Sequence, residues 1–299
     1  MKYIMCIDGG GTAIKYNVMD ETGVFVHESR QVATPHTKAG FVHTIEELLA
    51  QCDKQISGIS FSMPGFIDST TGYIDRGGAI EYFDKTNFYQ LFEHLNLPIS
   101  IENDGRCFAI AEMEVGNAQG CKDFICFTIG TGVGTGIVTN GALVKGATFR
   151  GGEYGMGFIF IDGKPQMYHH ACAMTALIQM YKVAKGLPLN TKIEGHDIFA
   201  EALTDETTAD VLATWYRNLA VAIWNLVMTF NPEKILLGGG VSAQPDLAHN
   251  IEKEILKFDY KGFWGDGFGI PIEPAKYRND SGFIGAFYHF KQMYPELFV

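Results

Sequence analysis

The feature that most constrains this chain is a glycine-rich turn between two short strands near its start. Residues 3–7 are apolar and predict a buried strand, and an acid and a glycine run follow it directly: Asp8, Gly9, Gly10, Gly11 and Thr12. Polar Lys15 and Asn17 then alternate with apolar residues, which predicts a second strand. Glycines let backbone N–H groups approach an anion closely. A turn of this kind inside a hairpin argues against Rossmann and P-loop folds, where the loop leads into a helix.

A second turn of the same kind lies near the middle of the chain. Residues 124–129 predict an apolar strand, Gly130 to Gly136 form a run of glycines and threonines, and Ile137 begins another strand. The run lacks the lysine of a P-loop, and Thr135 stands where a dinucleotide motif needs its third glycine. Two such hairpins facing each other could hold the phosphates of one nucleotide from both sides.

Composition narrows the class of protein. The 299 residues are 46% hydrophobic, which suits two domains of ordinary size. A net charge of −11 disfavours nucleic acid or an anionic membrane as the main partner. We expect no membrane span, because no apolar run approaches about 20 residues, and no signal peptide. The six cysteines are scattered and form no Cys-x-x-Cys pair, so we expect a reducing, cytoplasmic location.

The remaining pattern alternates strands and helices, which predicts an α/β fold. A strand at residues 56–61 runs into Pro64 and Gly65, and a strand at residues 98–101 runs into Glu102, Asn103 and Asp104. Ligands of open α/β sheets bind at the carboxyl ends of strands. Asp104 precedes a predicted helix over 106–115, so it is either a helix cap or a general base for phosphoryl transfer.

The second half offers further candidates. Glu153 lies in a glycine-rich loop and is either a ligand-binding carboxylate or part of a surface turn. Helices are predicted at about 172–185 and at 207–230, the latter as a core or an interface helix. Gly239 lies in a triple glycine after a predicted strand at 235–237. The adjacent pair His169-His170 is a weak metal signal, because a helix holds a metal with ligands three or four residues apart.

Together these motifs resemble the ROK family of bacterial sugar kinases and sugar-responsive repressors, within the actin-like ATPase superfamily. The resemblance spans nearly the whole chain. It implies two RNase H-like domains around a central cleft: residues 1–117, joined by a final helix at 284–299, would bind sugar and phosphate, and residues 118–283 would bind the nucleotide and dimerise. Because dimers are common in that family, the resemblance also implies a homodimer as a candidate assembly.

The resemblance also implies roles for individual residues. Asp104 would be the base towards the 6-hydroxyl of a sugar, and Asp8 would serve Mg²⁺ of a bound ATP. The other sugar contacts would be Pro64, Gly65, Asn103 and Glu153. The phosphates and the adenosine would lie against Gly9, Gly10, Gly11, Thr12, Lys15, Thr131, Gly132, Gly134 and Gly239.

Two departures from the family pattern concern zinc and the far end of the sugar. The family's Gly-Glu-x-Gly-His ends here in Met156, and its cysteine-rich zinc block is replaced by residues 168–176. We therefore expect no structural zinc. The missing groups would contact the O1/O2 end of the sugar, where His169 or His170 are candidate replacements. This predicts a 1-substituted glucose, such as a β-glucoside, as substrate.

Three readings stay open at this point. The first is an ATP-dependent sugar 6-kinase acting on a β-glucoside or disaccharide, on glucose or on N-acetylmannosamine. The second is a sugar-sensing repressor, which the acidic charge and the position of the first hairpin at residue 3 disfavour. The third is a sugar- or nucleotide-binding protein without activity, which the retention of Asp8 and Asp104 disfavours.

Overall fold

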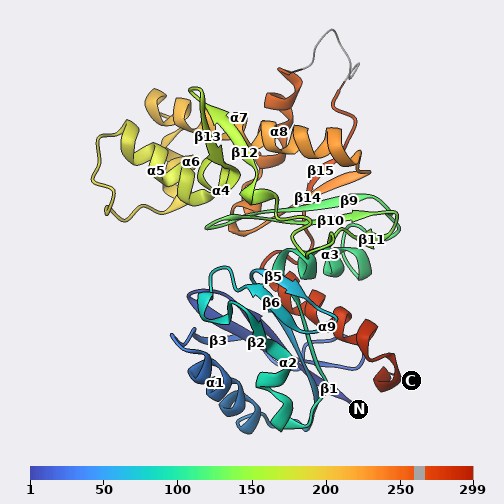
Figure 1. The fold of residues 1–299 in the computed structure, drawn as a ribbon. Coiled ribbons are helices and arrows are strands. Elements are labelled where there is room, and N and C mark those ends of the chain that lie inside the picture. Colours follow the sequence, from blue (N-terminus) through green and yellow to red (C-terminus); the bar gives the residue numbers. More distant parts are fainter. Residues whose placement is uncertain (259–266, 299) are drawn as a thin grey trace. The chain divides into compact units, whose positions relative to one another are not determined.

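The structure, a computed structural model, describes residues 1–258 and 267–298 and divides into two compact units. Unit 1 comprises residues 1–119, 145–151 and 280–299, and unit 2 comprises residues 120–144 and 152–279. Both units combine a five-stranded sheet with helices (Figure 1). The segment 145–151 belongs to unit 1, although the sequence analysis assigned it to the second domain.

The sheet of unit 1 has the order β3-β2-β1-β4-β8. The first three strands form an antiparallel meander, and β4 and β8 extend it in parallel from β1. The strands are β1 (Tyr3–Gly9), β2 (Ala13–Asp20), β3 (Arg30–Ala33), β4 (Ile56–Met63) and β8 (Ile99–Asn103). The carboxyl ends of β1, β4 and β8 therefore lie at one edge of the sheet.

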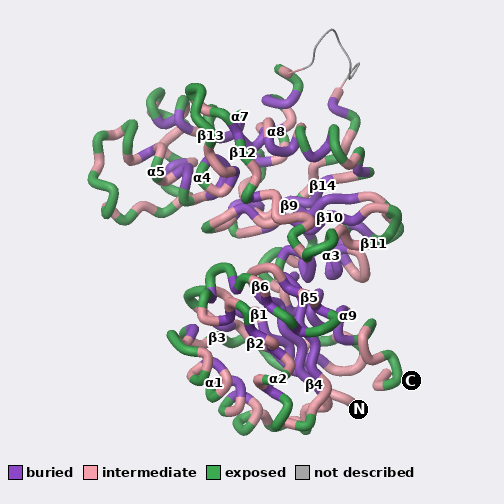
Figure 2. The backbone as a smooth tube through the Cα atoms, in the orientation of Figure 1, coloured by how far each residue is buried: buried purple, intermediate pink, exposed green. Residues whose placement is uncertain are grey.

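Helices cover both faces of this sheet. Ile7 and Phe61 pack into an aromatic core with α1 (Lys38–Ala50) and α2 (Phe88–Leu91) on one face. On the other face Ser60 donates a hydrogen bond to the carbonyl of Ala286 in α9 (Ser281–Met293) at 2.5 Å. The helix α3 (Asp104–Glu114) packs against α9. Figure 2 shows β1 and β4 as buried over most of their length.

A small sheet follows β4, and the sequence analysis did not predict it. It consists of β5 (Phe66–Asp68), β6 (Tyr73–Arg76) and β7 (Thr86–Asn87), paired antiparallel. Short 3₁₀ turns, Glu81–Phe83 and Glu93–Leu95, flank β7 and α2. These strands are too short for a two-residue period to stand out from the loop around them.

Unit 2 repeats the topology of unit 1. Its sheet has the order β11-β10-β9-β14-β15, with β9 and β10 antiparallel and β14 and β15 parallel to β9. The strands are β9 (Phe124–Ile129), β10 (Val133–Thr139), β11 (Ala142–Leu143), β14 (Lys234–Gly238) and β15 (Ile272–Pro274). In both units a glycine-rich turn therefore joins the central strand to its antiparallel neighbour.

The long helix α7 (Glu206–Phe230) forms the core of unit 2. Its Trp215, Leu219 and Ile223 are buried against Phe127 and Leu237 of the sheet. The helix predicted at 207–230 is thus confirmed and its apolar side is a core face. The helix predicted at 172–185 corresponds to α5, which begins at Met174, and Ala173 separates it from the shorter α4. The other elements are α4 (Tyr168–Cys172), α5 (Met174–Ala184), α6 (Gly195–Glu201), α8 (Leu247–Leu256) and the hairpin β12 (Phe158–Ile161)–β13 (Lys164–Met167).

No helix within residues 1–258 and 267–298 has the length and apolarity that a membrane crossing requires.

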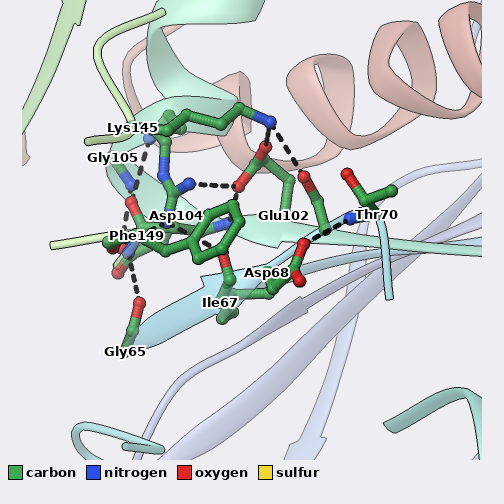
Figure 3. A network of polar contacts seen from close by, with 12 residues as sticks. Gly65, Ile67, Asp68, Thr70, Glu102, Asp104, Gly105, Lys145 and Phe149 are labelled. Carbon is green, nitrogen blue, oxygen red and sulfur yellow. Dashed lines mark hydrogen bonds and ion pairs between the residues drawn. The ribbon is translucent and has the colours of Figure 1, made fainter. Parts of the chain in front are cut away.

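A buried charge ties segment 145–151 to unit 1. Glu102, at the end of β8, is fully buried; its carboxylate lies 3.2 Å from the Arg106 guanidinium and accepts a hydrogen bond from Lys145 Nζ at 2.6 Å (Figure 3). Lys145 Nζ also donates to Ser69 Oγ at 2.8 Å. Burial opposes the ionisation of Glu102, but the two cations outweigh it and lower the pKa of the carboxyl. The carboxylate is therefore charged and paired.

We predict that Glu102→Gln strongly destabilises the protein. The change leaves the buried Arg106 cation without its counter-charge, which costs on the order of 3–5 kcal/mol of unfolding free energy. Arg76→Gln, which removes the exposed ion pair with Asp84, is the control and should leave the melting temperature unchanged. Chemical denaturation of both variants measures this, and equal stability of Glu102→Gln and wild type would contradict the role of the pair.

Candidate active site

Asp104 is the first residue of α3, directly after β8. The helix cap is its neighbour Asn103, whose Oδ1 accepts the N–H of Arg106 at 3.1 Å. Asp104 is exposed, and its carboxylate accepts the N–H of Gly105 at 2.8 Å. The capping role that the sequence analysis weighed for Asp104 thus falls to Asn103. This leaves the Asp104 carboxylate beside a helix N-terminus and outside the helix cap.

The surroundings of Asp104 make it a better base than an ordinary aspartate. Desolvation by the surrounding protein raises the pKa of the carboxyl to about 6, and the negative charge of Asp8 acts in the same direction. The Gly105 N–H and the Arg106 cation oppose this rise. A carboxylate with a pKa near the working pH is suited to take a proton from a hydroxyl group.

Gly65 is joined to the start of α3 by a hydrogen bond with Asn103, the neighbour of Asp104. Its carbonyl accepts a hydrogen bond from Asn103 Nδ2 at 3.1 Å. Its φ of +107° is unfavourable for other residues, and a Cβ here would lie 2.0 Å from the carbonyl oxygen of Arg76. The Pro64-Gly65 turn is therefore fixed against both the small sheet and the start of α3.

The first glycine turn is fixed by Thr34, which directly follows β3. Gly10 N–H donates to the Ala13 carbonyl at 3.0 Å, and the Gly10 carbonyl accepts from Thr34 Oγ1 at 2.5 Å. Thr34 N–H donates to the Thr12 carbonyl at 3.0 Å. Gly11 and Thr12 at the tip are exposed. The turn is thus rigid at its base and accessible at its tip, as an anion-binding loop requires.

Asp8 precedes this turn, at the carboxyl end of β1. Its Oδ1 accepts a hydrogen bond from Ser62 Oγ at 2.7 Å, and Lys15 is its partner across the hairpin. Desolvation raises the pKa of Asp8; Ser62 and Lys15 lower it, whereas Asp280 raises it. Mutual repulsion among carboxylates is the setting in which a divalent cation is stabilising, and carboxylate oxygen suits Mg²⁺. The residues present therefore fit a magnesium ion beside Asp8.

The second glycine turn, in unit 2, is fixed by helices α4 and α5. The Gly130 carbonyl accepts the N–H of Met174 at 2.9 Å, and the Thr131 carbonyl accepts Thr175 Oγ1 at 2.9 Å. Gly130 N–H donates to the Gly132 carbonyl at 2.9 Å. Thr131 is exposed at the tip. The carbonyl groups of this turn are therefore held by hydrogen bonds from α5, as those of the first turn are held by Thr34. Gly134 lies further along, in β10.

His169 is part of that support. Its Nδ1 accepts the N–H of Val133 at 2.9 Å, and its ring lies where a side chain on Gly132 or Gly155 would be. Burial and the neighbouring His170 lower the pKa of His169, which favours the neutral ring that can accept this bond. The sequence analysis considered His169 as a sugar ligand; the structure gives one of its nitrogens a backbone partner beside the second glycine turn.

The remaining candidates of unit 2 are Glu153, in the loop between β11 and β12, and Gly239, directly after β14. Glu153 is half-buried and precedes a 3₁₀ turn at Tyr154–Met156, and Met156 is exposed. Gly239 follows β14 with φ +83°, and a Cβ there would lie 2.3 Å from the carbonyl oxygen of Ile129. Within the described ranges no three His, Cys, Asp or Glu side chains gather as metal ligands. The absence of zinc stays a prediction.

The comparisons with known proteins decide the family. The model of the ROK family matches residues 4–293. The chain belongs to the ROK family. A β-glucoside kinase from Listeria monocytogenes is 33% identical over 295 residues, covering 97% of both chains. This membership confirms the resemblance that the order of motifs along the chain indicated.

Solved structures of ROK proteins share the fold. The Lmo2764 protein of Listeria monocytogenes superposes with a TM-score of 0.87 at 32% identity, covering 97% of this chain and 99% of that one. A ROK protein from Streptococcus pneumoniae in complex with sucrose gives 0.86 at 25% identity, with 98% and 99% covered. The fold is the two-domain α/β architecture of the actin-like ATPases, which agrees with the repeated sheet topology.

The raised pKa of Asp104 predicts that this residue lowers the stability of the unliganded protein. Ionisation is less favourable in the folded state than in the unfolded chain, so the loss of stability begins above pH 4 and is complete above about pH 6. Asp104→Asn should therefore raise the melting temperature at pH 7, without Mg²⁺ or nucleotide. The two proteins should converge towards pH 4. A variant less stable than wild type at pH 7 would contradict this interpretation.

Proposed function

We propose that this protein is an ATP-dependent kinase that phosphorylates the 6-hydroxyl of a β-glucoside, with Asp104 as general base. Relatives of this chain are named as sugar kinases, among them a β-glucoside kinase, a glucokinase and an N-acetyl-D-glucosamine kinase. The nucleotide, the substrate, the hydroxyl and the base are our proposal. The observation that carries it is the Asp104 carboxyl, exposed at the start of α3 and with its pKa raised to about 6.

The reaction needs a proton acceptor and a stable position for the charged phosphates. The Asp104 carboxylate would accept the proton as the hydroxyl oxygen attacks the γ-phosphorus of ATP. Asn103 and Gly65, which are hydrogen-bonded to each other, would orient the sugar beside it, with Glu153 as a further ligand. The first turn would hold phosphates with the N–H groups at its exposed tip.

The nucleotide side would be formed by both glycine turns. Thr131 and Gly132 would contact phosphates, with His169 keeping the second turn in place through Val133. Gly239 would lie near the adenosine. A magnesium ion held beside Asp8 would neutralise phosphate charge.

Two kinds of observation support a substrate whose O1 carries a substituent: the departure of this sequence from the ROK family pattern, and the names of two relatives. Met156 replaces the histidine that the ROK pattern places at the O1/O2 end, and a thioether cannot accept a strong hydrogen bond from a free 1-hydroxyl. The Listeria relative is named a β-glucoside kinase. The ROK protein from Streptococcus pneumoniae was solved with sucrose, a sugar without a free anomeric hydroxyl.

A substrate panel tests the proposal directly. We expect ADP release with ATP and Mg²⁺ on methyl β-glucoside and cellobiose, at a higher kcat/KM than on glucose, fructose or N-acetylmannosamine. Methyl 6-deoxy-β-glucoside, which lacks the attacking hydroxyl, is the matched control and should give none. Turnover confined to glucose or N-acetylmannosamine would overturn the β-glucoside assignment. Silence on every sugar, with nucleotide still bound, would favour a sugar-binding regulator.

The base assignment predicts the behaviour of Asp104→Asn. Turnover should fall by about 10²–10⁴-fold with KM for the sugar little changed, because an amide cannot accept the proton. In the wild type kcat/KM should rise with pH through about 6 as Asp104 ionises. Asp197→Asn, an exposed acid in α6, is the control and should keep full activity. Near-normal turnover in Asp104→Asn would remove this residue from the mechanism.

A further inference from the structure

A hollow of about 220 Å³ lies on unit 1 beside the β5–β6 hairpin, and the proposed chemistry does not use it. One wall is the face of the hairpin that carries residues 66, 68, 73 and 75, and the other is the segment 148–150. The side chains on which the argument rests are Phe66, Asp68, Tyr73, Asp75, Phe149 and Arg150. Three of the six are aromatic, which is the lining that flat ligand rings favour.

The aromatic rings are accessible and held in place. Tyr73 is 40% exposed, and Phe66 and Phe149 are half-buried. The Arg150 guanidinium lies 5.2 Å from the centre of the Phe66 ring and donates a hydrogen bond to Asp75 at 2.7 Å. Phe149 has φ +59°, an uncommon conformation for a bulky residue that often marks a functional segment.

The charges in the hollow favour a neutral ligand. Asp75 is paired with both Arg150 and Lys85, and their hydrogen bonds lower its pKa. The Asp68 carboxylate accepts hydrogen bonds from Thr70 N–H and Thr71 Oγ1, at 3.0 and 2.7 Å. The two acids are thus balanced by two cations, Arg150 and Lys85, so the hollow offers an ionic ligand no unpaired counter-charge. The aromatic faces suit the apolar side of a sugar or an aryl ring.

Both walls of the hollow are hydrogen-bonded to the segment that carries Asp104. Phe66 directly follows Gly65, whose carbonyl accepts from Asn103. The Phe149 carbonyl accepts a hydrogen bond from Arg106 Nη2 at 3.4 Å. Arg106 comes two residues after Asp104 in the sequence. Figure 3 shows Gly65, Phe149 and Asp104 close together around the start of α3. The hollow therefore adjoins the segment in which we place the sugar contacts Gly65, Asn103 and Asp104.

We propose that this hollow binds the group attached to O1 of the β-glucoside, a neutral ring that is either an aryl group or a second hexose. This rests on the proposed function and deepens it by assigning specificity to Phe66 and Tyr73. Pockets that hold a whole drug-sized ligand measure about 300–1,000 Å³, so 220 Å³ is the size of a subsite for one ring. Arg150 and Asp75 would supply hydrogen bonds at its rim.

The test compares three glucosides in the full-length protein: methyl, phenyl and glucosyl, the last being cellobiose. We expect Tyr73→Ala and Phe66→Leu to lower kcat/KM for phenyl β-glucoside about tenfold relative to methyl β-glucoside, mainly through KM. If cellobiose falls in parallel, the subsite binds either ring; if it does not, the subsite is for aryl groups. The control Phe160→Ala removes an exposed aromatic of unit 2 and should leave both ratios unchanged.

The possible failures are distinguishable. Wild-type protein that phosphorylates glucose but none of the three glucosides would reject the proposed function. Wild-type activity on the glucosides, with both ratios unchanged in the two variants, would reject the subsite alone. Melting temperatures within error of wild type show that the variants are folded, and Tyr73→Phe, which keeps the ring, should restore the ratio.

Discussion

The ionised Glu102 is the constraint on which the site of unit 1 depends. A buried carboxylate without partners would be very unfavourable, so Arg106 on α3 and Lys145 on a distant segment are both drawn to it. The residues that follow Glu102 are Asn103, which caps α3, and Asp104, which begins it. The position of the candidate base is therefore fixed by an ion pair, a helix cap and the end of a strand at the same point.

Local patterns in the sequence were sufficient for much of the fold. The two hairpin turns, the strands around them and the helix at 207–230 follow from short-range periodicity, which does not depend on distant partners. The repeat of one sheet topology in the two units follows from the same pattern. The family, indicated by motifs in order along the chain, was confirmed by the comparisons. Roles of single site residues, among them Glu153 and Gly239, stay predictions.

What the sequence did not reveal depends on residues far apart in the chain. Lys145 looks like an ordinary loop lysine until Glu102 is placed 2.6 Å away. His169 was considered for its chemistry towards a sugar, yet its Nδ1 is bonded to the backbone of Val133. The β5–β6–β7 sheet is made of strands of two to four residues. Each of these features needs tertiary pairing, for which a single sequence carries no periodic signal.

The composition of unit 1 also has a consequence for synthesis on the ribosome. Its sheet is complete once β8 has been made, but α9, which covers one face of that sheet, comes from the last 20 residues. Domains generally fold in the order in which they emerge, at about 5–20 residues per second. Unit 2 can therefore finish folding first, while unit 1 waits with an apolar sheet face uncovered. The synthesis of α9 should thus determine when this face of the unit 1 sheet becomes covered on the nascent chain.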